Sequence, residues 1–114
     1  MTPAIYNFKT HTAQDTFNGL QLTISLNDAP VDLTGVSEIK IIFKKRGYDT
    51  AIKTLVIDDG ITIDDAANGV FSINSFTVFT DPFTYAYDME FTYINGDVKT
   101  YMKGLFKVKP QTTA

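Results

Sequence analysis

The sequence has no cysteine, no tryptophan and a single histidine, His11. Without cysteine the chain can form neither a disulfide framework nor a thiolate nucleophile. A catalytic triad needs a serine or cysteine beside a histidine that a third group orients, and no serine here lies in a nucleophile-elbow pattern. We therefore predict no catalytic residue and no enzymatic activity, and we expect His11 in a loop at the surface.

Long apolar runs and an excess of positive charge are absent too. No apolar stretch approaches the roughly 20 residues of a transmembrane helix, and the N-terminus lacks the cationic start of a secretory signal. Thirteen acidic residues against ten Lys and Arg give a net charge of −3. A nucleic-acid surface needs an excess of Lys and Arg. These features predict neither a membrane nor a nucleic-acid partner.

The acidic pairs Asp58-Asp59 and Asp64-Asp65 raise the possibility of a calcium site, because calcium prefers oxygen ligands. An EF-hand loop counted from Asp64 would place Ala66 and Ser75 at ligand positions, so that pattern fails. Asp beside Gly is also what tight turns require, and we favour that interpretation. The sequence also lacks zinc-ligand spacing and a phosphate-binding glycine loop. We predict no metal, no cofactor and no small-molecule substrate.

The length of 114 residues suits one domain, residues 1–114, which needs no metal or disulfide to fold. Its dominant hydrophobic period is two, as where Leu20, Leu22 and Ile24 alternate with polar residues. The expected strands cover residues 20–26, 39–43, 51–57, 61–63, 69–76, 84–94 and 97–108. Many short strands separated by turn residues predict an all-β fold, specifically an antiparallel immunoglobulin-like β-sandwich of seven to eight strands.

The last two strands are expected to form a hairpin around Asn95-Gly96, the pair that a two-residue type I′ turn prefers. A two-residue loop fixes the register and places Tyr87 opposite Gly104 and Asp88 opposite Lys103. One face of the hairpin is then apolar and aromatic, and the other carries paired opposite charges. The missing side chain of Gly104 leaves room for the ring of Tyr87.

The same register places Glu90 opposite Tyr101 and Ala86 opposite Leu105 on the solvent-facing side. Ala86, Tyr101 and Leu105 then form a small apolar island among charges, with no core to enter. Tyrosine is enriched at protein interfaces because it buries a large area and keeps a polar tip. We predict that this island contacts a neighbouring subunit, either a second copy or another protein.

A short basic and aromatic loop, Lys44-Lys45-Arg46 with Tyr48, follows the strand at residues 39–43. The favoured interpretation is a solvated hairpin tip, since charges at strand ends also discourage edge pairing. The alternative is a partner-facing loop that contacts phosphate or an acidic protein. Tyr48 and Tyr101 are also the candidates for stacking on a sugar.

The segment from Asp81 to Tyr87 resembles the approach to strand F of immunoglobulin domains, where a tyrosine hydrogen-bonds back to its own loop. Tyr85 would be this corner tyrosine. Tyr87 would take the core position that cysteine holds in those domains.

Five segments carry a wider resemblance, in this order: residues 30–35 (Pro-Val-Asp-Leu-Thr-Gly), 68–73, 85–91, 95–100 and 104–108. Together they resemble the N-terminal immunoglobulin-like domain of the baseplate upper protein family of tailed bacteriophages, over roughly residues 15 to 109. In the first segment Asp32 and Thr34 can cap a turn with side-chain hydrogen bonds, and Gly35 suits a backbone conformation that other residues resist.

The resemblance implies a non-enzymatic virion structural protein, assembled in the cytoplasm of the host bacterium. It would act as a tail or baseplate adaptor that binds other virion proteins and possibly itself. Two alternatives stay open: a capsid decoration protein, and a carbohydrate-binding module. The family usually continues into long receptor-binding regions after this domain, whereas this sequence stops at Ala114.

Overall fold

The computed structural model describes residues 4–111 and is built almost entirely from β-strands. In chain order these are β1 (Ala4–Ile5), β2 (His11–Thr12), β3 (Thr16–Phe17), β4 (Leu20–Thr23), β5 (Ser25–Leu26), β6 (Ala29–Pro30), β7 (Val36–Lys45), β8 (Ala51–Ile57), β9 (Gly60–Asp65), β10 (Val70–Ile73), β11 (Phe76–Thr77), β12 (Thr84–Tyr93) and β13 (Val98–Lys109). Within the described residues, helical structure is limited to the 3-10 turn η1 (Ala66–Asn68). The all-β prediction is confirmed.

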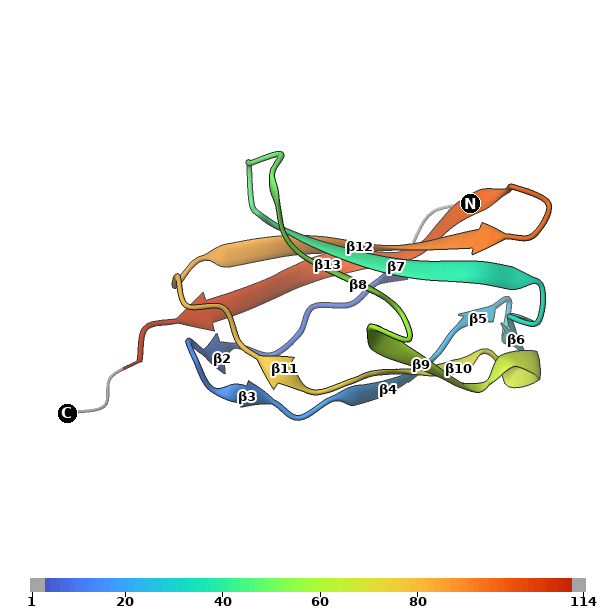
Figure 1. Ribbon diagram of the computed structural model, residues 1–114, viewed down its shortest axis with the longest axis horizontal. Helices are drawn as coiled ribbons and strands as arrows, with labels where there is room; N and C mark the ends of the chain where they lie inside the picture. Colours follow the sequence, from blue (N-terminus) through green and yellow to red (C-terminus); the bar gives the residue numbers. More distant parts are fainter. Residues whose placement is uncertain (1–3, 112–114) are drawn as a thin grey trace.

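One long sheet has the strand order β1-β13-β12-β7-β8-β9-β10-β4. Figure 1 shows that it curls, so that β7, β12 and β13 form an upper layer and β4, β9 and β10 a lower one. β2 also pairs with β13, and the small sheets β3-β11 and β5-β6 lie in the lower part of the molecule. The core lies between the two layers.

The pairing is not antiparallel throughout, which corrects the expectation from the sequence. Both β1 and β2 run parallel to β13, and β8 runs parallel to β9. The described chain also has more strands than the seven to eight expected. Ile24 interrupts the first predicted strand, and the polar N-terminal region contributes β1, β2 and β3 without a clear apolar period.

The parallel step from β8 to β9 is a sharp corner. Val56 pairs with Gly60 across Asp58-Asp59, whereas parallel neighbours in a sheet normally need a connection of about a dozen residues. Asp58 and Gly60 both adopt a left-handed backbone, with φ of 68° and 106°. A Cβ on Gly60 would lie 2.6 Å from Cδ2 of Leu55. The first acidic pair therefore makes the bend by which the chain passes between layers.

Alternate residues of the long strands fill the core, as the period of two predicts. The buried residues of β7 and β12 are Ile39, Ile41, Phe43, Tyr85, Tyr87, Met89 and Phe91. Burial of each large apolar side chain contributes roughly 1.5–3 kcal/mol, so this contact between layers dominates the stability of the fold.

Residues 4–12, termed the N-terminal segment, lie along the outer edge of β13. The amide of Tyr6 donates to the carbonyl of Lys103, and that of Phe8 donates to the carbonyl of Leu105, each at 3.0 Å. The Phe8 side chain is only 6% exposed, and its ring centroid lies 5.2 Å from that of Tyr87. An aromatic anchor and backbone bonds thus hold the segment in place.

The expectation that His11 lies in a surface loop is wrong. Its ring stacks on Phe106 at 5.0 Å between centroids and lies 5.3 Å from Phe17. Its Nδ1 atom is buried and has no hydrogen-bond partner among the described residues. The polar residues around His11 suggest a surface loop. The position of β2 is determined instead by its pairing with the end of β13, which the local sequence does not reveal.

Gly104 faces Tyr87 as predicted, but the space it leaves is used differently. A Cβ at this position would lie 1.9 Å from the carbonyl oxygen of Tyr6 and 3.0 Å from Oδ1 of Asn7. That carbonyl accepts a hydrogen bond from the Tyr87 hydroxyl, and Asn7 Oδ1 accepts one from the Leu105 amide at 3.0 Å. Gly104 therefore admits the backbone of the N-terminal segment rather than a ring.

Candidate functional site

The hairpin of β12 and β13 positions the predicted interface residues, and its register is only partly as expected. Tyr87 pairs with Gly104, Asp88 with Lys103 and Met89 with Met102, as predicted. Beyond Met89 the register shifts by one, so that Glu90 pairs with Thr100 instead of Tyr101. The shift is a β-bulge, in which one strand supplies an extra residue opposite its partner.

The loop explains the shift. The Tyr93 amide donates to the Asp97 carbonyl at 2.8 Å, and the Gly96 amide donates to the Tyr93 carbonyl at 2.9 Å. The bond between Tyr93 and Asp97 therefore closes a loop of three residues, 94–96, in which Gly96 alone of the predicted pair has a positive φ, 95°. A three-residue hairpin loop with glycine in the left-handed region replaces the predicted type I′ turn. Asn95 instead accepts a hydrogen bond from the Asp97 amide at 2.9 Å.

Tyr101 is the residue that the bulge displaces, and it does not join Ala86 and Leu105. Its ring lies 5.0 Å from that of Phe91, which is fully buried, and its hydroxyl lies 2.6 Å from that of Tyr93. Burial and this hydrogen bond raise the pKa of Tyr93. The predicted three-residue island is thus wrong for Tyr101, because the bulge turns its side chain toward the core.

Ala86 and Leu105 remain neighbours on the outer face, by which we mean the solvent-facing side of β1, β13, β12 and β7. Ala86 lies between Leu105 of β13 and Lys44 of β7. These residues border a groove of about 600 Å³, whose apolar lining also includes Ile5, Ile42 and Tyr48. The structure therefore joins two surfaces that the sequence suggested separately, the hairpin island and the basic loop.

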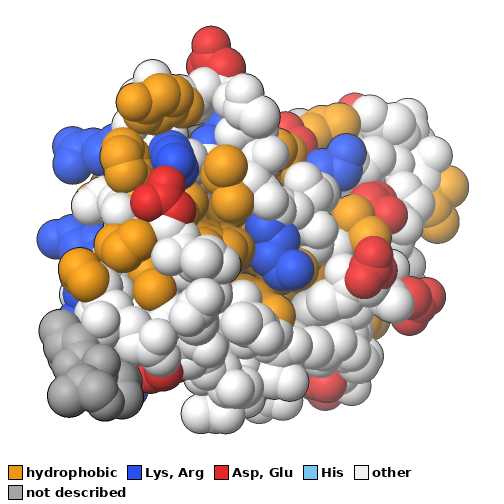
Figure 2. All heavy atoms as spheres, turned by 60° about the vertical axis from the view of Figure 1, so that its left-hand side comes forward, with side chains coloured by type: hydrophobic (Ala, Val, Ile, Leu, Met, Phe, Trp, Pro, Cys, Tyr) orange, Lys and Arg blue, Asp and Glu red, His pale blue; other side chains and the backbone are white. Residues whose placement is uncertain are grey.

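Charged side chains alternate with the apolar ones on this face. Asp88 lies between Ile42 and Lys103, and Glu90 lies beside Lys40. Figure 2 shows hydrophobic side chains interspersed with Lys, Arg, Asp and Glu on the side of the molecule that it brings forward. An apolar floor beside charges of both signs is the arrangement of protein interfaces, where an apolar centre is surrounded by a polar rim.

Three residues of the basic loop, Lys44, Lys45 and Tyr48, line this groove. Lys45 forms an ion pair with Asp81 and lies over the ring of Phe83, 5.3 Å from its centroid. The hydrogen bond with Asp81 raises the pKa of the Lys45 ammonium. Tyr48 is 61% exposed and touches Phe83, with 5.8 Å between ring centroids. Arg46 is exposed and does not line the groove.

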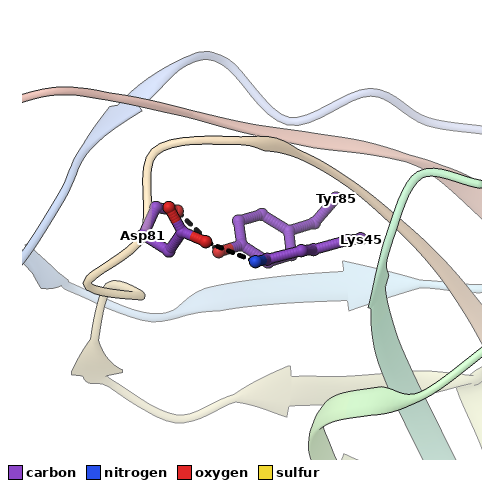
Figure 3. A network of polar contacts seen from close by, with 3 residues as sticks. All are labelled: Lys45, Asp81 and Tyr85. Carbon is purple, nitrogen blue, oxygen red and sulfur yellow. Dashed lines mark hydrogen bonds and ion pairs between the residues drawn. The ribbon is translucent and has the colours of Figure 1, made fainter. Parts of the chain in front are cut away.

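Tyr85 forms the predicted corner (Figure 3). Its hydroxyl donates to the carbonyl of Asp81 at 2.6 Å, while the Asp81 carboxylate holds Lys45. Burial raises the pKa of the Tyr85 hydroxyl. The corner therefore ties the loop before β12 to the end of β7, beside the outer groove.

The Asp32 turn is as predicted, but the role given to Gly35 is not. Oδ1 of Asp32 accepts a hydrogen bond from the Thr34 amide at 2.8 Å, and hydrogen bonding to Thr34 lowers the pKa of the carboxyl group. Gly35 has no positive φ, and a Cβ there would make an ordinary contact of 3.9 Å with Tyr93. The Gly35 carbonyl accepts a hydrogen bond from the Ile94 amide at 2.9 Å, and the carbonyl of any other residue at this position could accept the same bond.

Among residues 4–111, no three His, Asp or Glu side chains gather closely enough to suggest a metal site. No helix in this part of the chain is long and apolar enough to span a bilayer. No family model, curated protein or solved structure matches this sequence. The interpretation of the outer groove therefore depends on its own geometry.

Proposed function

We propose that the two layers form an immunoglobulin-like sandwich. The order β13-β12-β7 corresponds to strands G, F and C of such domains, and β4-β10-β9 corresponds to B, E and D. The hydrogen bond from Tyr85 to the loop before β12 supports the same assignment. The parallel pairing of β8 with β9 is then the corner that joins the two layers.

We propose that this domain is a non-enzymatic structural protein of a tailed-bacteriophage virion, an adaptor or assembly module of the tail or baseplate. The observation that carries the proposal is the outer groove, where Ala86 and Leu105 form an apolar floor beside Lys44 and Tyr48. The resemblance to the baseplate upper protein family supports the phage assignment. The partners are other virion proteins, and the protein is assembled into particles in the bacterial cytoplasm.

The test is particle incorporation. Immunogold labelling of particles purified from the bacterial strain that carries this gene should place the protein at the tail or baseplate. Labelling of the head would favour the capsid decoration alternative, and unlabelled particles would overturn the virion role.

A groove variant then tests the site. Ala86→Asp with Leu105→Asp should abolish incorporation, because two carboxylates would replace the apolar floor on which the partner packs and would have to be desolvated there. The matched control is Thr16→Asp with Thr77→Asp, an exposed cross-strand pair on β3 and β11 that lies outside the groove. Equal incorporation of the groove variant and wild type would overturn the site, provided that both fold.

The exposed ring of Tyr48 at the groove is the one observation that favours carbohydrate binding. Tyr101, the second ring considered for that function, packs against Phe91 instead. A glycan that binds wild type but not Tyr48→Ala would support that function in place of a protein partner.

A further inference from the structure

The long sheet ends at β4, and the outer edge of this strand is unpaired within the described residues. The Ile24 amide donates to the Gly69 carbonyl, and the Ile24 carbonyl accepts from the Val31 amide. In the antiparallel ladder the backbone groups of every second residue before Ile24, those of Leu22 and Leu20, are therefore directed toward β10. The backbone N–H and C=O of Gln21 and Thr23 therefore point away from the sheet. Within residues 4–111, no backbone group of a turn or loop forms a hydrogen bond with them.

Proteins usually protect such edges with charge, proline, a bulge or a covering segment. The outer edge of β13 is covered by the N-terminal segment, and the exposed part of β8 carries Lys53 and a bulge opposite Phe43. β4 reads Leu-Gln-Leu-Thr, without a charge or a proline, and pairs with β10 without a bulge. This edge is therefore open to another extended strand.

A groove of about 670 Å³ lies beside this edge, between β3–β4 and the N-terminal segment. Its apolar lining includes Phe8, Phe17 and Leu20. Leu20 and Leu22 of β4 are only half-buried, on the side that packs toward the core. A strand added to β4 would extend this apolar side and cover both leucines.

We propose that a second copy of this chain occupies the edge, with β4 of each copy antiparallel to β4 of the other about a two-fold axis at Leu22. Gln21 of one copy then pairs with Thr23 of the other, and their outward N–H and C=O groups form hydrogen bonds in both directions. This register uses the extended residues 20–24 and avoids Gly19, whose φ of 91° bends the chain.

The side chains of the strand are complementary to themselves in this register. Leu22 faces its own copy and Leu20 faces Ile24, so the apolar side of the sheet continues across the axis. Gln21 lies beside Thr23 on the other side, and no like charges meet. A two-fold interface requires such self-complementarity, because the same patch serves both partners.

The first test is sedimentation equilibrium of wild type and Thr23→Pro. Proline removes the outward N–H, which the fold itself leaves free, and its ring blocks the approach of a strand. We expect the dissociation constant of the dimer to rise at least tenfold, with an unchanged circular dichroism spectrum, while Thr23→Ala associates like wild type. A wild-type chain that stays monomeric up to about 1 mM, the weak end of the affinity range, would overturn the proposal. So would a folded Thr23→Pro that associates like wild type.

Cross-linking tests the register even if Thr23→Pro fails to fold. The chain has no cysteine, so a single Leu22→Cys can form a disulfide only with a second copy. Directly opposed residues in a non-hydrogen-bonded pair have Cα atoms about 4.5 Å apart, within the range of a disulfide. Mild oxidation should cross-link Leu22→Cys, and leave the exposed control Thr54→Cys on β8 monomeric. Equal cross-linking of both variants, or none of Leu22→Cys, would contradict the proposed pairing.

Discussion

The two ends of the long sheet differ in how their edges are finished. At β13 the chain covers its own edge with the N-terminal segment, which adds Phe8 to the core and uses the space left by Gly104. At β4 the edge has no covering strand among the described residues, although half-buried leucines lie directly behind it. At the β13 edge, the covering segment fits because Gly104 leaves space for its backbone and the Phe8 ring packs in the core. At the β4 edge, the only features that favour a covering strand are unpaired backbone groups and the lack of charged side chains.

This difference separates stability from association. Substitutions along the covered edge should destabilise the folded chain, because they disturb packed contacts within one molecule. Substitutions along the open edge should leave the isolated chain almost unchanged and alter only its contacts with a partner.

The largest expected effect is that of Phe8→Ala. Loss of a buried phenylalanine at the covered edge should lower the free energy of unfolding by about 4 kcal/mol. Chemical denaturation measures the loss, and the exposed Tyr48→Ala, expected below about 1 kcal/mol, is the control. A similar small loss for Phe8→Ala would mean that the N-terminal segment does not belong to the stable core.

Gly104→Ala should follow, with a loss of about 3 kcal/mol, because the added methyl group collides with the backbone of Tyr6. Gly96→Ala makes a matched comparison, since Gly96 has open space around it but a positive φ. Backbone strain alone should cost about 1 kcal/mol there. Hydrogen exchange at residues 4–12 should accelerate in Gly104→Ala and not in Gly96→Ala. Equal losses for the two variants would contradict the role of Gly104 as a slot for the segment.

Tyr87→Phe should cost about 2 kcal/mol at neutral pH, because the carbonyl of Tyr6 loses its donor in a part-buried site. The difference between the denaturation midpoints of the variant and wild type measures this loss of stability. An unchanged midpoint would show that the segment is held without this hydrogen bond.

Alkaline pH should weaken the covered edge as well. Burial raises the pKa of Tyr87, so the folded chain keeps its proton at a pH where the unfolded chain, with a pKa of about 10, loses it. The stability from this shift is complete below pH 10 and decreases above it, by at most about 1.4 kcal/mol per pH unit for one tyrosine. The slope of stability against pH between 10 and 11 should be shallower in Tyr87→Phe than in wild type. Parallel slopes would assign the alkaline loss to other tyrosines.

The smallest effect is expected at the open edge. Thr23→Lys should change the stability of the isolated chain by no more than about 0.5 kcal/mol, as is usual for exposed positions without packed partners. Denaturation at a concentration well below that of association measures this. A loss above about 1 kcal/mol would indicate that this edge is covered within the single chain.

The sequence predicts those parts of the fold that depend on hydrophobic alternation. The long strands β7, β8, β12 and β13 lie close to their expected positions. The last hairpin has the predicted register in the half that is distant from its loop, up to the pair Met89–Met102. Between Met89 and the loop the register differs by one residue, because the loop has three residues instead of two. The bulge at Tyr101 compensates for the extra loop residue, and no local sequence pattern predicts the loop length or the bulge. The side on which Tyr101 lies follows from that bulge and not from its neighbours in the sequence.

The N-terminal segment could not be placed from its own composition, because long-range pairing with β13 determines its position. Gly104 is the one residue of β13 that signals the segment, but from sequence its absent side chain fits the ring of Tyr87 as well as it fits the backbone of Tyr6. The candidate site shows the same limit. Ala86, Leu105, Lys44 and Tyr48 were each identified from sequence, but only the pairing of β12 with β7 brings them into one groove.

The parallel course of the N-terminal segment along β13 has a mechanical consequence. β1 pairs with Met102 and Lys103 and β2 with Val108 and Lys109, both parallel to β13, so a pull that separates β1 from the end of β13 is directed along these paired strands. The hydrogen bonds between these parallel strands are evenly spaced and run across the direction of the pull, so they are loaded together, in shear, rather than opening one after another. Single-molecule stretching should therefore meet one dominant force barrier at the start of extension, before the rest of the sheet unravels.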